Sequence, residues 1–132
     1  MTAVKLEHAR RVISAAEKKA REIGQAMNIA VADEGGNIVA HVRMDNAWIG
    51  SIDIAMKKAY TSRAFEIETK ELAKHSHRQA SSSAFMFQTT AKSRFFTGGI
   101  PLKVDKVVGA IGVNGGSGDQ DHAVAAAGAA AF

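Results

Sequence analysis

One predicted strand carries polar side chains in a pattern that suits recognition of an anion. Residues 38–44 form this strand, and successive residues along a strand point to opposite faces. The two faces carry Ile38, Ala40, Val42 and Met44, and Val39, His41, Arg43 and Asp45. On the second face, Arg43 could hold an anion through paired hydrogen bonds while Asp45 orients the guanidinium. The alternative is a solvated face, or a structural ion pair between Arg43 and Asp45.

Glycine gathers in the last third of the chain. Gly98-Gly99 precede Ile100, and Gly109 and Gly112 lie within a predicted strand at 107–113. Gly115-Gly116 follow that strand and lead into Asp119-Gln120-Asp121-His122. Glycine in a strand gives up packing and backbone entropy, so it usually marks a close approach of something else. The residue types leave two alternatives open, namely a helix packed on a small-residue face or a ligand groove with a main-chain floor.

Histidines and carboxylates offer metal chemistry. An imidazole that points into an apolar slot could ligate a metal ion. The histidines are His8, His41, His75, His77 and His122. His41 shares its strand face with Arg43, and His122 lies in the first turn of the last predicted helix. Glu68, Glu71 and His75 fall on roughly one helical face, which predicts a weak iron or zinc site unless the row is simply solvated.

Several other chemistries are excluded by the sequence. Cysteine is absent, which excludes disulfides, thiolate catalysis, iron–sulfur ligation and covalent haem attachment. No Walker-type run or Gly-x-Ser-x-Gly elbow occurs, and residues 112–115 do not complete a dinucleotide fingerprint. The net charge of +4 is scattered among acidic partners and aromatic residues make up 6%, so we expect no nucleic-acid binding.

Composition and length indicate one domain spanning residues 1–132. Hydrophobic residues are 46% and charged residues 23%, which is typical of a globular protein in water. No apolar run approaches the roughly 20 residues that cross a bilayer, so we expect no membrane partner. The first residues lead directly into a helical pattern rather than a signal peptide, and we expect a cytoplasmic protein.

Periodicity predicts the elements that must position these residues. Leu6, Ala9, Ile13, Ala16, Ala20 and Ile23 form a helical stripe within 3–24. Strands at 27–33 and 38–44 form a hairpin, and helices follow at 51–65, with Ser51 as N-cap, and from about 69. Residues 78–92 indicate no single element. An edge strand or turn at Pro101, the strand at 107–113 and a helix at 119–132 complete an order that favours an antiparallel sheet flanked by helices.

The chain resembles a known family through six sequence blocks that cover nearly its whole length. They are Val31-Ala32-Asp33-Glu34-Gly35-Gly36, Arg43-Met44-Asp45, Lys58-Ala59-Tyr60-Thr61, Gly98-Gly99-Ile100-Pro101-Leu102, Gly109-Ala110-Ile111-Gly112-Val113 and Gln120-Asp121-His122-Ala123-Val124-Ala125. The family is the GlcG/HbpS-type, or haem-degrading, domain family, which includes the PduO C-terminal domain.

This resemblance implies an α+β, profilin-like fold in three layers, with a five-stranded antiparallel sheet and helices on both faces. It also implies a homo-oligomer, an octamer in the HbpS manner or a tetramer. Two departures from the family pattern stand out. This chain shows no export segment, unlike HbpS, and Asp105-Lys106 stands where the family leads us to expect glycine, which predicts a longer or differently shaped hairpin.

Three functions follow from the residues and the resemblance. The first is an accessory protein that binds haem or a related tetrapyrrole, with haem and iron as candidate cofactors. The second is a catabolic enzyme or carrier for a small carboxylate or keto acid, in which Arg43 holds the carboxylate and Lys58 or His122 supplies a base. In that function, backbone N–H groups near Gly98-Gly99 or Gly115-Gly116 bind the developing oxyanion.

The third function is a structural interaction module built on the small-residue helix at 123–132, which suits close packing within or between subunits. Whether the chain is an enzyme stays open. We expect the polar strand face and the glycine segments to converge on one cavity for a small-molecule ligand. The candidate ligand-binding residues are His41, Arg43, Asp45, Lys58, Thr61, Gly98, Gly99, Asp121 and His122.

Overall fold

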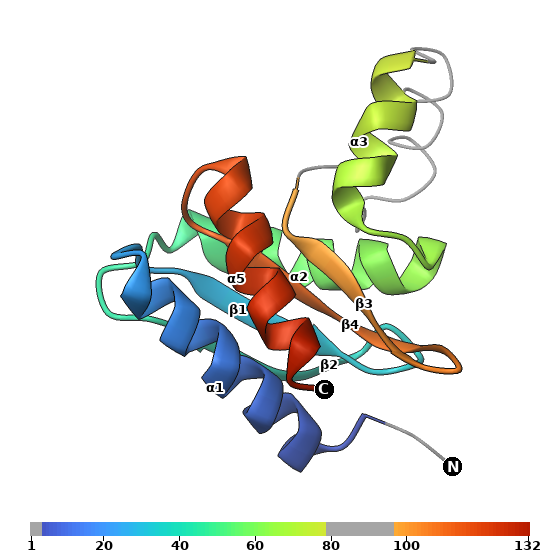
Figure 1. Ribbon diagram of the computed structural model, residues 1–132, viewed down its shortest axis with the longest axis horizontal. Coiled ribbons are helices and arrows are strands. Elements are labelled where there is room, and N and C mark those ends of the chain that lie inside the picture. The colour runs from blue at the N-terminus through green and yellow to red at the C-terminus, as the bar shows by residue number, and fades with distance from the viewer. Residues whose placement is uncertain (1–3, 79–96) are drawn as a thin grey trace.

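The computed structural model describes residues 4–78 and 97–132, which form three layers around one antiparallel sheet (Figure 1). The elements, in chain order, are α1 (Leu6–Glu22), β1 (Asn28–Ala32), β2 (Ile38–Arg43), α2 (Gly50–Phe65), α3 (Thr69–Arg78), β3 (Gly99–Val104), β4 (Lys106–Asn114) and α5 (Gly118–Ala130). This order confirms the predicted succession of helices and strands. The stretch 78–92, for which the sequence indicates no single element, lies almost wholly outside the described residues.

The sheet has the strand order β2-β1-β4-β3, and every neighbouring pair is antiparallel. The α+β class and the antiparallel sheet are therefore confirmed. The family resemblance predicts five strands, whereas residues 4–78 and 97–132 supply four, so the strand count and the profilin-like label stay predictions. None of the helices in these residues is both long enough and apolar enough to cross a bilayer.

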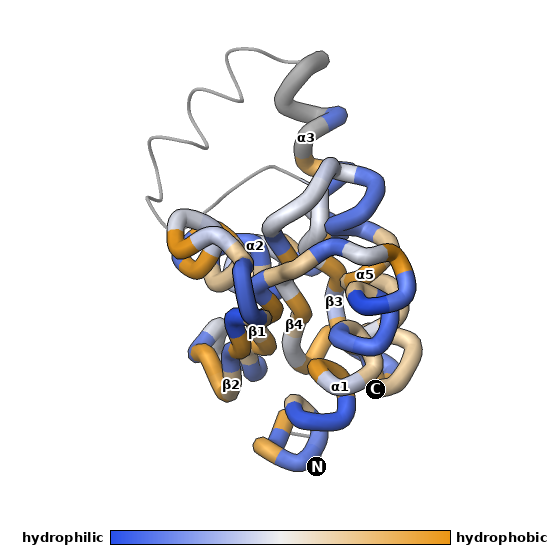
Figure 2. Tube along the Cα trace, turned by 90° about the vertical axis from the view of Figure 1, so that its left-hand side faces the viewer, coloured by the Kyte–Doolittle hydropathy of each residue, from blue (hydrophilic) through white to orange (hydrophobic). Residues whose placement is uncertain are grey.

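The central strands divide their side chains between two unequal cores. Ile29 and Val31 of β1 belong to the large apolar cluster with α1 and α5, whereas Ala30 and Ala32 point to α2. Figure 2 shows strongly apolar stretches in the strands, which lie between α2 and the pair α1 and α5. Strand alternation explains the division, because large and small residues occupy alternate positions along β1 and β4.

Gly112 lets α2 lie directly on the sheet. A Cβ atom at this position of β4 would collide with the backbone of Ala55 and Ala59. For Gly112, helix packing on a small-residue face is therefore the correct one of the two alternatives left open by the sequence. On the opposite layer Gly128 does the same for α5, because a Cβ there would reach Ala16 and the backbone of Val12 in α1.

The predicted helical stripe of α1 is confirmed for four of its six residues. Ala9, Ile13, Ala16 and Ala20 are buried, together with Val12. Leu6, in the first turn, is 46% exposed and so does not belong to the buried stripe. The apolar end of the chain packs within the subunit, since Val124, Ala125 and Gly128 of α5 are buried.

A β-bulge corrects the predicted faces of β2. The pairing with β1 shifts between Val31 and Ala32, so that Ile38 pairs with Ala32 and Val39 is the additional residue. Ile38 therefore lies on the α2 side, whereas Val39 packs against the large core with Ala40 and Val42. Strict alternation is wrong for Ile38 and Val39 because one residue is inserted.

Two turn and cap assignments also differ from the sequence expectation. Helix α2 begins at Gly50, and the hydroxyl of Ser51 accepts a hydrogen bond from Asn114 Nδ2 at 2.8 Å instead of capping the helix. In the β3–β4 hairpin, Asp105 adopts a left-handed φ of 65°, which aspartate tolerates better than most residues. This turn closes without the expected glycine, and a register shift follows Leu102.

Candidate functional site

Lys58 is a charged side chain that is enclosed in the interior of the protein. It projects from α2, and its side chain is 1% exposed. Its Nζ donates to the backbone oxygen of Val113 at 2.9 Å, to Asn114 Oδ1 at 2.6 Å and to Asp121 Oδ2 at 3.1 Å. An ammonium group has three N–H donors, so every donor of Lys58 is satisfied. The amine therefore ties α2 to the end of β4 and the start of α5.

Asp121 holds the other end of this buried ion pair. Its side chain is 4% exposed, and its Oδ1 accepts from the backbone N–H of Gly116 at 2.9 Å. The Gly115 amide also donates to this carboxylate. Ser117 and Gln120 form a capping box that starts α5 and fixes the turn from which Asp121 projects.

Burial shifts both groups of the pair toward their neutral forms. Desolvation lowers the pKa of the Lys58 amine, and attraction to Asp121 opposes part of that shift. Desolvation likewise raises the pKa of the Asp121 carboxyl, against the attraction of Lys58 and the hydrogen bonds from the Gly115 and Gly116 amides. Each charge is therefore stable only while its partner is charged.

The backbone at Gly98 packs closely against the Lys58–Asp121 pair. Its φ is 124°, and a Cβ there would lie 3.2 Å from Lys58 Nζ and 3.1 Å from the Cβ of Asp121. The Gly98 carbonyl also accepts from the Val113 amide at 2.9 Å. The sequence thus correctly placed a close main-chain approach at this glycine. The structure brings together Lys58, Gly98 and Asp121 from three distant parts of the chain.

Three of the four backbone amides proposed as an oxyanion hole, those of Gly99, Gly115 and Gly116, are already engaged. Gly99 N–H donates to Thr69 Oγ1 at 2.8 Å, and a Cβ at Gly99 would meet Thr69 and the Lys58 carbonyl. The Gly115 and Gly116 amides donate to Asp121. These groups hold the fold together, so an incoming oxyanion would have to displace internal hydrogen bonds.

His122 follows Asp121 in α5 and lies against α3. Lys70 Nζ is 3.5 Å from His122 Nε2, a long contact, and Lys70 is also 3.5 Å from Glu68 Oε1. His122 Nδ1 is buried and has no hydrogen-bond partner among residues 4–78 and 97–132. A polar atom left in that state is unusual, because an unsatisfied buried group costs free energy.

Comparison with known proteins identifies the family. The family model described as "Haem degrading protein HbpS-like" matches residues 4–130. The chain belongs to the HbpS-like family. An uncharacterized 15.0 kDa protein from the dhaT-dhaS intergenic region of Citrobacter freundii is 37% identical over 125 residues, which cover 92% of this chain and 87% of that protein.

Two solved structures share the fold of this HbpS-like chain. A double mutant of HbpS from Streptomyces reticuli has a TM-score of 0.88 and 35% identity, covering 98% of this chain and 87% of that one. A structure titled as a PduOC:heme complex has a TM-score of 0.92 and 27% identity, covering 99% of this chain and 96% of that one. The resemblance found from the sequence blocks is therefore confirmed.

The polar row of β2, defined as His41, Arg43 and the following Asp45, lies at the opposite edge of the sheet of this HbpS-like chain from Gly99. Gly99 pairs with Gly112, Gly112 pairs with Ala30, and Ala30 pairs with His41. Gly99 and His41 therefore lie on the two edge strands of the sheet, β3 and β2. Within one chain, the expected convergence of Arg43 with Gly98-Gly99 on a single cavity is wrong. Strand order, which the sequence pattern does not specify, is the physical reason.

Residues of this row make local contacts instead. Arg43 Nη1 donates to the Ala47 carbonyl at 3.2 Å, and within the described part of the chain no ion pair joins Arg43 to Asp45, which is exposed. Asn28 Oδ1 lies 2.9 Å from His41 Nε2. Because Asn28 Nδ2 donates to the Trp48 carbonyl, its Oδ1 is the acceptor and His41 Nε2 is the donor. Burial and the charge of Arg43 lower the pKa of His41.

The remaining sequence candidates take part in helix contacts. The Thr61 hydroxyl is buried and donates to the Lys57 carbonyl at 2.7 Å. Glu68 pairs with Lys70, and Glu71 pairs with Lys74 at 3.3 Å. The His75 side chain lies outside the described residues. Within the described residues no group of three metal-ligating side chains occurs, so the proposed metal site has no support here.

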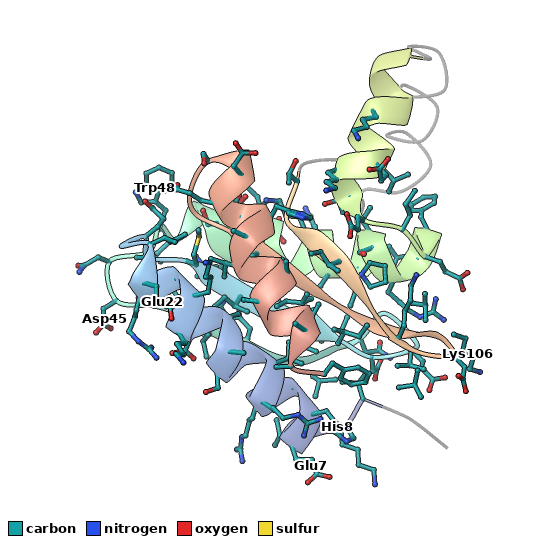
Figure 3. The ribbon with its side chains drawn as sticks, in the orientation of Figure 1. Glu7, His8, Glu22, Asp45, Trp48 and Lys106 are labelled. Carbon is teal, nitrogen blue, oxygen red and sulfur yellow. The ribbon has the colours of Figure 1, made fainter. Side chains whose placement is uncertain are left out.

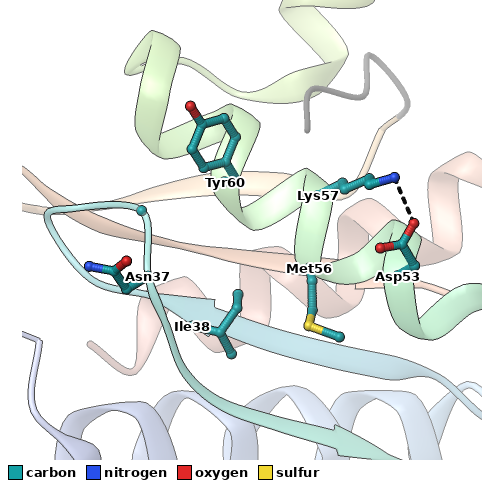
Figure 4. A pocket seen from close by; sticks show the side chains of 7 residues that line it. Asn37, Ile38, Asp53, Met56, Lys57 and Tyr60 are labelled. Carbon is teal, nitrogen blue, oxygen red and sulfur yellow. Dashed lines mark ion pairs between the residues drawn. The ribbon is translucent and has the colours of Figure 1, made fainter. Parts of the chain in front are cut away.

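A pocket that the sequence reading missed opens between the first hairpin and α2 (Figure 4). Its volume is about 300 Å³, and its walls include Asn37, Ile38, Asp53, Met56, Lys57 and Tyr60. Lys57 and Asp53 pair across its rim at 2.7 Å. Gly36, with a φ of 76°, brings the turn against the Tyr60 ring. In the sequence, only the turn at residues 34–37 could have pointed to this pocket. The turn residues do not reveal that α2 forms the other wall.

Proposed function

We propose that this chain binds haem or a related tetrapyrrole beside His122, where α3 meets the start of α5. Haem iron takes an imidazole as an axial ligand. His122 is a half-buried imidazole with one nitrogen that has no partner in the described residues and another in a weak contact. The observation that carries the proposal is the weak engagement of His122 Nε2, whose one contact within the described residues, to Lys70 Nζ, is 3.5 Å long.

Lys70 would bind a second part of the ligand, a carboxylate. Its ammonium group suits a propionate carboxylate, and its 3.5 Å contact with His122 Nε2 is long for a hydrogen bond. A carboxylate that attracts Lys70 would therefore release the lone pair of the imidazole. Bound haem would supply a redox-active iron at this end of the molecule, while His122 would hold the iron and Lys70 the propionate.

The comparisons support this proposal without extending it to chemistry. The family description names haem degradation, and a structural relative is titled as a heme complex. In this chain the Lys58–Asp121 pair fixes the first turn of α5, from which His122 projects. The pair would act as a support for the ligand and would not itself touch the haem.

Titration of the purified protein with haemin tests the proposal. We expect a saturable Soret shift at about one haem per chain, its loss in His122→Ala, and weaker binding in Lys70→Ala. His8→Ala is the matched control, since His8 lies at the start of α1 and contacts the Phe132 ring. Nonspecific broadening, or a His122→Ala titration that matches the unsubstituted protein, would refute it.

The second function, a catabolic enzyme or carrier for a small carboxylate or keto acid, has no comparable support. Lys58 is enclosed with all its donors satisfied, and Arg43 lies at the far edge of the sheet. A substrate held by Arg43 would therefore not reach Lys58 in the same chain. The third function, an interaction module, depends on the surface rather than on this site.

A further inference from the structure

The pocket between the first hairpin and α2 adjoins a second hollow. This second hollow has a volume of about 210 Å³, and its walls include Glu34, Tyr60 and Arg63. Gly36 and Tyr60 line both hollows, so the two meet at the Tyr60 ring. We call the two adjoining hollows the hairpin groove. Together they fall in the range of roughly 300–1,000 Å³ that is typical of small-molecule sites.

One face of α2 forms the first wall of the hairpin groove. Asp53, Met56, Tyr60 and Arg63 follow one another at spacings of three and four residues, which places them on one side of the helix. From Met56 to Arg63 the helix rises by about 10 Å. The wall is therefore long enough to contact both ends of a small organic molecule.

The opposite wall is a turn of fixed shape. Asp33 Oδ1 accepts hydrogen bonds from the backbone N–H groups of Gly35 and Asn37, each at 3.0 Å. A carboxylate that closes a turn in this way restrains the backbone on both sides of Glu34. Less conformational freedom is then lost when a ligand binds against the turn.

The hairpin groove lies away from the polar row of β2. The turn at residues 34–37 comes before β2, whereas Arg43 is the last residue of that strand. Strand β1 pairs with β4 from Asn114 toward the start of β4, so the turn that follows β1 faces the end at which β4 begins with Lys106. Figure 3 shows Lys106 at the opposite end of the molecule from Asp45 and Trp48.

Two opposite charges line one end of the hairpin groove without joining each other. Glu34 comes from the turn and Arg63 from α2, and within the described part of the chain no ion pair connects them. Arg63 Nη1 lies 3.7 Å from Glu66 Oε1, a long contact to a side chain that is 64% exposed. Each charge at this end of the groove therefore keeps capacity for a partner.

Arg63 also carries an unsatisfied donor. Its Nε is buried and has no hydrogen-bond partner among residues 4–78 and 97–132, a state that costs free energy. Because Glu66 contacts Nη1, the edge formed by Nε and Nη2 keeps two parallel donors, the arrangement that binds both oxygens of a carboxylate. The side chain is 23% exposed, so a small rotation would present this edge to the hollow.

The other end of the hairpin groove is apolar at its centre. Ile38 and Met56 line it from β2 and α2 (Figure 4). Ile38 is 39% exposed, and Met56 is partly buried. The Tyr60 ring lies between this apolar end and the charged end. Methionine sulfur and a tyrosine ring both make favourable contacts with an aromatic group.

We propose that the hairpin groove binds an α-amino acid with an apolar, preferably aromatic, side chain. Its carboxylate lies at Arg63, its ammonium group lies at Glu34, and its side chain passes Tyr60 toward Met56. A simple anion would be attracted by Arg63 and repelled by Glu34, and a simple cation would meet the reverse. An α-amino acid carries both charges on neighbouring atoms, so it matches both walls at once.

Isothermal titration calorimetry with three related probes tests this proposal. Phenylalanine carries both charged groups, phenylpropanoate lacks the ammonium group, and phenethylamine lacks the carboxylate. We expect phenylalanine to bind saturably at one molecule per chain. Each of the other two should bind at least tenfold more weakly, because each leaves one charge of the groove without a partner.

Substitutions assign each charge to its wall. Arg63→Met should weaken phenylalanine binding about tenfold or more and remove the advantage of phenylalanine over phenethylamine. Glu34→Gln, which keeps the shape of the side chain, should remove the advantage of phenylalanine over phenylpropanoate. Arg10→Met is the matched control, since Arg10 is an exposed arginine on α1 and its loss changes the net charge equally.

Circular dichroism checks that each variant is folded, and Glu34→Gln keeps the proposal testable if Arg63→Met does not fold. An unsubstituted protein that shows no saturable binding of phenylalanine would overturn the proposal. Equal binding of phenylalanine and phenylpropanoate would assign the groove to simple carboxylates and also overturn it. Neither Glu34 nor Arg63 belongs to the proposed haem site, so the two proposals can fail separately.

Discussion

At the scale of single residues, we expect substitutions of the charged groups in the interior to reduce the stability of the fold most. Lys58 and Asp121 are costly to bury, and each is stabilised by the other together with fixed backbone groups. The sequence placed both among the candidate ligand-binding residues, and Lys58 also as a possible base. Their enclosure could not be read from the sequence, because a lysine on a helix is ordinarily solvated.

Lys58→Met should destabilise the protein by about 3–5 kcal/mol, because it leaves the Asp121 carboxylate buried without a counter-charge. Lys57→Met is the matched control, since Lys57 pairs with an Asp53 that is 68% exposed, and its loss should cost about 0–1 kcal/mol. Urea unfolding measures both. A double substitution Lys58→Met with Asp121→Asn should cost less than the sum of the single changes, and strict additivity would contradict the coupling.

His41 should make stability depend on pH. Burial first, and then the charge of Arg43, lower the folded pKa of His41 below its unfolded value of about 6.5. Between those two pKa values the unfolded chain binds more protons, so stability rises with pH through this window and is lost as pH falls through it. The loss of stability is complete once the pH has fallen below the folded pKa of His41.

Urea midpoints for the unsubstituted protein and His41→Gln, taken between pH 5 and 7.5, check this expectation. Glutamine keeps a donor for Asn28 Oδ1 but does not titrate. We expect the variant to show a flatter pH dependence in the window. An unchanged slope would assign the dependence to another group.

At the scale of elements, small residues decide how closely the layers approach. Ala30 and Ala32 of β1, with Gly112 of β4, present a nearly flat face to α2. The same strands place Ile29 and Ile111 on the other side, where α1 and α5 leave room for larger side chains. The inserted Val39 shows the limit of pattern reading, because one bulge reverses the faces of the residues before it.

Gly112→Ala should destabilise the fold by about 1–3 kcal/mol, since the new Cβ meets the backbone of α2, which cannot rotate away. Gly50→Ala is the matched control at the start of α2, where a Cβ would meet nothing within 4 Å. That change should be neutral or slightly stabilising, because alanine favours a helix. Thermal unfolding compares the two, and equal behaviour would mean that α2 moves freely on the sheet.

At the scale of the whole molecule, strand order separates two surfaces that the sequence suggested as one. The order β2-β1-β4-β3 places Arg43 at the β2 edge, whereas Gly98 precedes β3 and its carbonyl accepts from the Val113 amide of β4. The candidate ligand-binding residues therefore lie in two separate regions of one chain. The proposed haem site near His122 can therefore be tested without altering Arg43.

The sequence by itself determined the element order, the α+β class, the family and the importance of the late glycines. These are local properties, set by side-chain periodicity, turn residues and short motifs. Only the tertiary structure decided that Lys58 meets Asp121 beneath Gly98, while Arg43 stays at the opposite edge. Contacts of this kind depend on strand order and helix placement, which arise from the joint packing of distant segments rather than from any local pattern.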